Sequence, residues 1–229
     1  MNRKLILGLA VALPLLPIVE WVVSGVRDIG AIGVSQAPLS LLVLYYPARV
    51  LGLVGFVLMF YQFLLSARLP ALQKVFKQPN LLKTHRSLGK LGFVLIALHG
   101  VMMLASDGVE YGRIAFTTEK LLGIGALFLL VIAVVAAWWM KPLQFSMKTW
   151  KRFHILAYVV FPLAFFHAIT IGTVAAAWSP TRVLFILFFA GYLYVLGRKL
   201  IAVSRGYSSP GGSKTPAQTA TSQTEGSAG

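Results

Sequence analysis

An uninterrupted apolar stretch occupies residues 121–140 and reads LLGIGALFLLVIAVVAAWWM. A helix needs about 20 such residues to cross the hydrocarbon core of a bilayer, which is roughly 30 Å thick. Because that core contains no water, the backbone of a crossing segment has to satisfy its own hydrogen bonds, and a helix does so. The stretch therefore predicts a membrane-spanning helix.

Five other segments have a similar length and apolar character. Together they give six predicted spans, at residues 5–23, 44–65, 88–105, 120–140, 153–172 and 182–200. This pattern predicts an all-α, polytopic membrane protein built as a six-transmembrane-helix bundle. The first segment follows Arg3 and Lys4 and has two interpretations, an uncleaved anchor and a signal peptide; no small-x-small cleavage motif follows it closely.

Composition agrees with a membrane protein. Hydrophobic residues make up 58% of the 229 residues, charged residues make up 12%, and the mean hydropathy is +0.79. A soluble domain carries about 25% charged residues, so a soluble enzyme, a disordered chain and a nucleic-acid-binding arm are excluded. The chain contains no cysteine, which excludes disulfides, iron–sulfur clusters and thiolate zinc sites.

The net charge of +15 is unevenly distributed along the chain. Basic residues concentrate in the loops after the second and fourth spans, as Arg68, Lys74, Lys77, Lys83, Arg86, Lys141, Lys148, Lys151 and Arg152. Acidic residues lie in or beside the opposite loops, as Asp28, Asp107, Glu110 and Glu119. Since basic loops stay in the cytoplasm, we expect an integral protein of the bacterial cytoplasmic (inner) membrane with both termini cytoplasmic. The basic side should also attract anionic lipids.

Residues 205–229 differ from the rest of the chain. Sixteen of these 25 residues are Gly, Ser, Thr or Pro, and none is Ile, Leu, Val or Phe. A segment with so few apolar side chains cannot bury a core. We predict a transmembrane domain over residues 1–204, followed by a disordered cytoplasmic tail.

All four histidines of the chain lie in or beside two of the predicted spans. Thirteen residues separate His85 from His99, and twelve separate His154 from His167. At a rise of about 1.5 Å per residue, the members of each pair are roughly 20 Å apart along their helix. Both spans run in the same direction, so His85 and His154 share the cytoplasmic depth, and His99 and His167 share the outer depth.

Two helices that each offer one imidazole at two matched depths suit two stacked b-type haems. Each iron would take one histidine from each helix, and an iron with two axial imidazoles has no open position and suits electron transfer. The protein's contribution is to hold the cofactor and tune its potential. A single membrane histidine is often an ordinary packing or hydrogen-bonding residue, but four at paired depths favour haem ligation.

The second histidine pair is out of phase on an ideal helix. Fourteen steps of about 100° bring His99 back to nearly the same face as His85, whereas thirteen steps leave His167 about 140° away from His154. We expect Pro162, which lies between them, to bend and re-phase the helix. Small residues near the histidines would let a flat ring approach, as Gly89, Gly92 and Gly100.

Anionic haem propionates need cationic partners. Near the cytoplasmic pair the candidates are Arg86, Lys90, Lys151 and Arg152. Near the outer pair the candidate is Arg49, which lies within the second span, where an unpaired charge is costly. Two other interpretations of Arg49 are open, namely that it extends to the outer headgroups and that it pairs with Glu20.

The histidine motifs resemble those of a known family. Residues 82–89, LKTHRSLG, and residues 98–100, LHG, resemble the third helix of the ferric reductase-like transmembrane family. Residues 150–154, WKRFH, with Tyr158 four positions further on, resemble its fifth-helix motif. The family includes ferric reductases, NADPH oxidases and the membrane haem subunit of the periplasmic methionine sulfoxide reductase system.

The resemblance extends over residues 40–200 and includes residues 49–52 and 62–68, which are similar to bacterial members. It implies six helices with two haems between helices three and five. It also implies electron flow from cytoplasmic NAD(P)H through FAD to the inner haem, the outer haem and an outside acceptor. The sulfoxide reductase subunit often lacks the first histidine of helix three, so the presence of His85 favours a complete two-haem path.

The flavin and nicotinamide domains that normally follow helix six in this family have no counterpart in the sequence. We therefore expect FAD or FMN only through a partner, with a separate flavin reductase or a quinol as the electron donor. The expected acceptor is ferric iron or a periplasmic redox partner, docking at residues 106–119 and 173–181. Because no nucleophile constellation or carboxylate pair is visible, we expect an oxidoreductase component without catalytic residues of its own.

Two other functions would use the same histidines. A quinone-linked cytochrome b subunit of a respiratory complex would keep both haems and take its electrons from quinol. A transporter or channel would use the histidines to bind a metal or to relay protons. No two histidines lie one helical turn apart, however, as a compact metal site would require.

Overall fold

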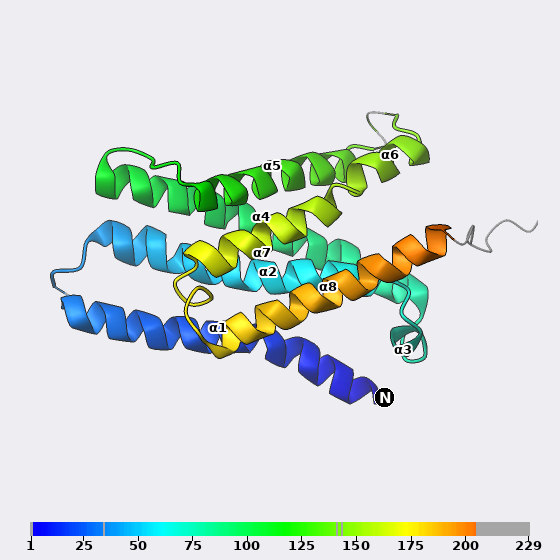
Figure 1. Ribbon diagram of the computed structural model, residues 1–229, viewed down its shortest axis with the longest axis horizontal. Helices are drawn as coiled ribbons and strands as arrows, with labels where there is room; N and C mark the ends of the chain where they lie inside the picture. The colour runs from blue at the N-terminus through cyan, green and yellow to red at the C-terminus, as the bar shows by residue number, and fades with distance from the viewer. Residues whose placement is uncertain (1, 34, 141, 143, 205–229) are drawn as a thin grey trace, which may run out of the picture. The chain divides into compact units, whose positions relative to one another are not determined.

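The computed structural model describes residues 2–33, 35–140, 142 and 144–204, and most of these residues are helical (Figure 1). The elements, in chain order, are α1 (Arg3–Ile32), η1 (Leu41–Tyr45), α2 (Tyr46–Ser66), α3 (Pro70–Gln73), α4 (Gln78–Tyr111), α5 (Thr118–Trp138), α6 (Met147–His154), α7 (Ala157–Ile171) and α8 (Pro180–Ser204). The chain up to Val195 forms one compact unit, and Leu196–Ser204 complete α8. The predicted tail, residues 205–229, lies outside the described residues.

Six helical segments in the described part of the chain are long and apolar enough to cross a membrane, which confirms the number predicted. They are Arg3–Ile32, Leu41–Ser66, Gln78–Tyr111, Thr118–Trp138, Met147–Ile171 and Pro180–Ser204. The second span begins with the π-helical turn η1, and the fifth combines α6 and α7.

Helix α4 is longer than its apolar stretch, and its end residues explain why. Pro79 lies in the first turn, where the missing backbone N–H of proline has no helical partner to lose. Gly112 follows the last turn with a φ of 64°, in the left-handed region that glycine adopts without strain. Residues 106–111, which the sequence assigned to an outer loop, are therefore helical.

Two helix pairs organise the histidine-bearing spans. α4 packs mainly against α2, and α7 packs mainly against α5, whereas contacts between the two pairs are sparser. The members of each pair are consecutive spans, so they run in opposite directions. The histidines lie on α4 in one pair and on α6 and α7 in the other. The closest backbone contacts between the two pairs join α4 to α5 and α2 to α7.

Aromatic rings from α2, α7 and α8 fill the interior. Phe56 packs against Phe161, with ring centroids 4.9 Å apart, and against Phe185, with centroids 4.2 Å apart. Phe60 stacks on Phe188 at 4.2 Å. All five rings are buried. These contacts fix α7 beside α2 and so help to set the position of the histidine that α7 carries.

Prolines interrupt the backbone hydrogen bonds of α1 and α7, and tyrosines from neighbouring helices replace the lost donors. Pro14 leaves the carbonyl of Ala10 without its helical partner, and the hydroxyl of Tyr61 donates to that carbonyl at 2.9 Å. Pro162 has the same effect, and the carbonyl four residues before it accepts a 2.6 Å hydrogen bond from Tyr192. Such replacement allows proline inside membrane helices, where no water can serve as donor.

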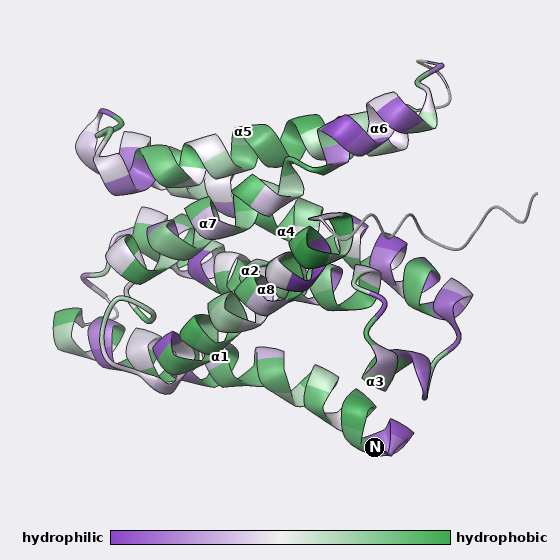
Figure 2. Ribbon diagram, turned by 45° about the vertical axis from the view of Figure 1, so that its right-hand side comes forward, coloured by the Kyte–Doolittle hydropathy of each residue, from purple (hydrophilic) through white to green (hydrophobic). Residues whose placement is uncertain are grey.

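Polar and apolar residues separate along the helices. Hydrophobic colour dominates the long helices, and hydrophilic colour lies toward their ends, including α6 and the region around α3 (Figure 2). The exposed basic residues Arg86, Lys90, Lys151 and Arg152 lie on α4 and α6. We call the end of the bundle that holds them the basic end. Many apolar side chains are exposed, including Val11, Val19, Val23 and Val26 on α1. A continuous apolar surface of this kind fits contact with lipid.

Candidate functional site

The four histidines form two pairs. The basic-end pair is His85 and His154, with ring centroids 6.1 Å apart and an angle of 71° between the rings. The far pair is His99 and His167, with centroids 6.3 Å apart and an angle of 65°. The structure thus brings together the residues that the sequence places at matched depths. Each pair joins one residue of α4 to one of the fifth span, and all four side chains are half-buried.

A tightened turn changes the phase of His154. α6 ends at His154, and α7 begins three residues later. Between them the N–H of Leu156 donates to the carbonyl of Phe153, which is a 3₁₀-type bond. A 3₁₀ turn advances about 120° per residue instead of about 100°, so it rotates His154 toward the face of the second histidine. This tightened turn precedes α7, which continues as one helical element through Pro162. A bend at Pro162 stays a prediction.

Backbone carbonyls orient both rings of the far pair. Nδ1 of His99 lies 2.9 Å from the carbonyl oxygen of Ala48 on α2. Nδ1 of His167 lies 2.8 Å from the carbonyl oxygen of Glu119, in the first turn of α5. A carbonyl oxygen only accepts, so Nδ1 is the donor in both bonds and carries the proton. In the neutral imidazole, Nε2 then keeps its lone pair and is available to a metal.

The ring separations fit a metal between the two imidazoles of each pair. A metal–imidazole bond of about 2.0 Å places the metal roughly 3.1 Å from the ring centre, so two imidazoles on opposite sides of one metal have centroids about 6.2 Å apart. The observed separations are 6.1 and 6.3 Å. No group of three His, Asp or Glu side chains gathers among the described residues. Each pair therefore offers two ligands, the number that a haem iron takes from the protein.

The basic-end pair has different surroundings. Trp150 stacks on His154, with ring centroids 5.0 Å apart and an angle of 16° between the planes. Nδ1 of His85 is buried and forms no hydrogen bond within the described residues. The backbone of Gln62 on α2 lies close to this ring, and its carbonyl accepts a 2.8 Å hydrogen bond from the hydroxyl of Ser66.

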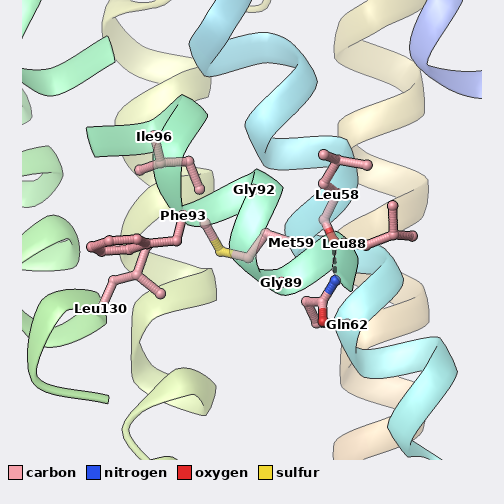
Figure 3. Close-up of a pocket in the computed structure, with 9 residues that line it drawn as sticks. All are labelled: Leu58, Met59, Gln62, Leu88, Gly89, Gly92, Phe93, Ile96 and Leu130. Carbon is pink, nitrogen blue, oxygen red and sulfur yellow. Dashed lines mark hydrogen bonds between the residues drawn. The ribbon is translucent and has the colours of Figure 1, made fainter. Parts of the chain in front are cut away.

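A small cavity of about 40 Å³ lies between α2, α4 and α5 (Figure 3). Its α4 lining falls between the two histidine levels and includes Gly89 and Gly92, two of the glycines expected to admit a flat ring. A Cβ at Gly89 would lie 3.1 Å from Oε1 of Gln62, and a Cβ at Gly92 would lie 3.4 Å from Cβ of Leu58. The two glycines therefore let side chains of α2 pack closely against α4. The approach of a flat ring at these positions stays a prediction.

The sequence of this region matches a known family. The family described as ferric reductase like transmembrane component matches residues 51–165, half of the chain. The chain belongs to this family. The matched segment contains three of the four histidines, and His167 lies two residues beyond it. No curated protein matches the chain. Six apolar spans and this membership together make the chain an integral membrane protein.

In this ferric reductase-like protein, Arg49 is only 8% exposed and lies inside the protein. Its guanidinium is 3.8 Å from a carboxylate oxygen of Asp28 and donates to the hydroxyl of Ser24 at 3.1 Å. It also lies over the ring of Tyr46, 5.2 Å from the centroid. The side chain is therefore held by α1 and α2 and does not extend to the headgroups, contrary to one of its interpretations.

Glu20 is not the partner of Arg49. Its carboxylate accepts a 3.1 Å hydrogen bond from the backbone N–H of Thr181, in the first turn of α8. Arg49 follows Ala48, whose carbonyl accepts the hydrogen bond from His99. Both residues therefore lie on the same turn of α2. Its Nε is buried without a hydrogen-bond partner among the described residues. Both features agree with the propionate role that we predict.

Basic side chains flank the basic-end pair of this ferric reductase-like protein. Arg86 follows His85, and Lys151 and Arg152 lie within one turn before His154. Like Lys90, all three are exposed, and none forms an ion pair with an acidic residue that the structure describes. They therefore present positive charge at the surface nearest this pair.

Two acidic residues of the expected docking segment, residues 106–119, are engaged in contacts between elements. Asp107 of α4 forms an ion pair with Lys120 of α5. Glu110 of α4 accepts a hydrogen bond from the hydroxyl of Ser40 at 2.9 Å. Both contacts tie the end of α4 to its neighbours, and docking of an acceptor at these residues stays a prediction.

Sequence reasoning missed the groups that support the histidines. Trp150 lies four residues before His154, a spacing that puts two side chains on the same helix face, so this stack could have been predicted. The carbonyls of Ala48 and Glu119 carry no such signal, because every residue has a carbonyl and only the packing of the helices selects two of them.

Proposed function

We propose that this protein carries electrons across the membrane through two b-type haems, each bound by one histidine of α4 and one of the fifth span. The observation that carries the proposal is the separation of the imidazole centroids, 6.1 Å in the basic-end pair and 6.3 Å in the far pair. Membership of the ferric reductase-like family supports it.

The histidines would bind the cofactor through Nε2. Bound haem supplies an iron that gains and loses one electron while both axial positions stay filled. In the far pair, the carbonyls of Ala48 and Glu119 keep the proton on Nδ1 and hold each ring in one orientation. Among the cations, Arg49 would pair with a propionate at the far pair, and Arg86, Lys151 and Arg152 would do so at the basic-end pair.

The distribution of charge supports a direction of electron flow. Exposed basic residues at the basic end favour a cytoplasmic location under the positive-inside rule, with both termini on that side of a bacterial inner membrane. Electrons would enter at His85 and His154 and leave from His99 and His167. The donor would be a separate flavin reductase with FAD or FMN, or a quinol, and the positive surface suits an acidic protein. The acceptor would be ferric iron or a periplasmic reductase.

Haem content tests the proposal. Protein expressed with an adequate haem supply and purified in detergent is expected to hold about two b-type haems per chain and to give the reduced-minus-oxidised spectrum of bis-imidazole iron. Reduction by NAD(P)H with a flavin reductase, compared with reduction by a quinol, identifies the donor. Folded protein that takes up no haem, even after incubation with haemin, would overturn the proposal.

A further inference from the structure

Gly52 leaves the room that the ring of His99 occupies. A Cβ built at Gly52 would lie 2.8 Å from Nδ1 and 2.9 Å from Cε1 of His99. Such distances are too short for non-bonded atoms, so a side chain at this position would displace the ring. The carbonyl that accepts the hydrogen bond of His99 belongs to Ala48, four residues before Gly52.

The same arrangement occurs on α5. A Cβ built at Gly123 would lie 2.8 Å from both Nδ1 and Cε1 of His167. The accepting carbonyl belongs to Glu119, again four residues before the glycine. Each helix pair therefore holds its far histidine with a carbonyl and a glycine at the same spacing.

Helix geometry explains this spacing. Side chains of an α-helix lean toward its N-terminus, so the side chain of residue i+4 covers the carbonyl of residue i. Glycine at i+4 exposes that carbonyl, whose second lone pair can then accept from an imidazole N–H. Neither Gly52 nor Gly123 has a positive φ, so the backbone conformation does not require glycine at either position. Space for the ring is what they provide.

The basic-end pair lacks this arrangement on α2. Fourteen positions beyond Ala48 and Gly52, the corresponding residues are Gln62 and Ser66. The hydroxyl of Ser66 occupies the Gln62 carbonyl at 2.8 Å. Nδ1 of His85 has no hydrogen bond within the part of the chain that the structure describes.

We propose that Gly52 and Gly123 are positioning residues that expose the carbonyls of Ala48 and Glu119 to the far histidines and thereby give the far haem the lower reduction potential. The inference rests on the proposed function, because it concerns bound haems. A carbonyl that accepts from Nδ1–H makes Nε2 more basic. A more basic axial ligand stabilises ferric iron relative to ferrous iron, which lowers the potential.

Redox titration of Gly52→Ala and Gly123→Ala, followed by the absorbance of the reduced haems, tests the inference. Gly125→Ala is the matched control on α5, because no atom lies within 4 Å of a Cβ at that position. Gly55→Ala is the control for packing on α2, because its Cβ would lie 2.6 Å from Cγ1 of Ile96 and touches no histidine. His99→Ala identifies the far haem as the component that it removes.

We expect Gly52→Ala and Gly123→Ala each to raise the midpoint potential of the far haem, to leave the other haem unchanged, and to weaken retention of the far haem by roughly 10–100-fold. Gly125→Ala should change neither potential, and Gly55→Ala, which disturbs the packing at Ile96 without touching a histidine, should shift the far-haem potential less than Gly52→Ala does. If Gly52→Ala does not accumulate, Gly123→Ala makes the same test on a different helix.

Two results would overturn the inference and leave the two-haem proposal intact. One is an unchanged far-haem potential in both glycine variants, and the other is an equal, selective shift in Gly55→Ala. Wild-type protein without haem would instead contradict the proposed function itself, so the two failures are distinguishable.

Discussion

The far pair and the basic-end pair have nearly equal ring separations, 6.3 and 6.1 Å, but different supports. Helix backbone holds the far pair, through carbonyl oxygens 2.9 and 2.8 Å from the two Nδ1 atoms. In the basic-end pair, His154 stacks on the side chain of Trp150, and Nδ1 of His85 has no hydrogen bond within the described residues. A carbonyl within a helix cannot rotate, whereas a side chain can.

This difference indicates that identical ligands do not make identical sites. Cations lie near both pairs and favour the reduced iron at each, because reduction removes one positive charge. The expected difference between the two sites therefore comes from the hydrogen bonds at Nδ1. At the far pair, hydrogen-bonded imidazoles favour the oxidised iron. We therefore expect the far haem to have the lower potential, so that removal of electrons by the acceptor drives transfer from the basic end.

Removal of a ligand should have the largest effect. His99→Ala and His167→Ala should each lose the far haem, and His85→Ala and His154→Ala should each lose the other, so that haem content falls from about two to about one per chain. Haem assayed per mole of purified protein measures the loss, and Leu98→Ala, at an exposed neighbour of His99, is the control. Loss of both haems from one folded variant would contradict two separate sites.

Trp150→Ala should affect the basic-end pair alone. The variant removes the ring that lies against His154, and we expect about tenfold weaker retention of that haem, since supporting residues commonly contribute 10–100-fold. Transfer of haem to an excess of apomyoglobin measures retention, and Trp150→Phe should restore most of it. An equal loss from both haems would show that Trp150 acts on the whole bundle.

Charge removal should have a smaller effect that differs between the ends. Arg49→Gln should lower the potential of the far haem more than Lys151→Gln lowers that of the basic-end haem, because Arg49 is buried and Lys151 is exposed. Titrations at low salt and at about 1 M salt, where the Debye length is about 3 Å, measure both shifts. The change in potential caused by Lys151→Gln should disappear at high salt, whereas the change caused by Arg49→Gln should persist. The reverse result would contradict a buried Arg49 and an exposed Lys151.

Ser66→Ala should have the smallest effect. It frees the carbonyl of Gln62 from its 2.8 Å hydrogen bond and makes it available to Nδ1 of His85. A neutral hydrogen bond contributes about 1 kcal/mol, so we expect a small fall in the potential of the basic-end haem and none in the far haem. A rise in the basic-end potential would show that this carbonyl does not support His85.

The spans and the depths of the histidines could be predicted because they depend on local properties. The length of an apolar stretch fixes a span, and the rise per residue fixes where His85 and His99 lie along α4. Paired depth then indicated which histidines would face each other. This reasoning needs no knowledge of how one helix is rotated against the next.

Details that depend on rotation between helices could not be predicted. Arg49 pairs with Asp28 and not with Glu20, and the choice depends on which face of α1 turns toward α2. Because α1 is apolar on most faces, its sequence does not specify that rotation. The tight turn after His154 likewise reflects packing of the fifth span, since nothing in residues 153–157 predicts it.

A redox titration of the wild-type protein, compared with one of His99→Ala, tests most directly whether two unequal haem sites exist. The wild type should give two components of equal amplitude, and His99→Ala should lack the one of lower potential. A single component, or loss of the component of higher potential in His99→Ala, would contradict two sites distinguished by the hydrogen bonds at Nδ1.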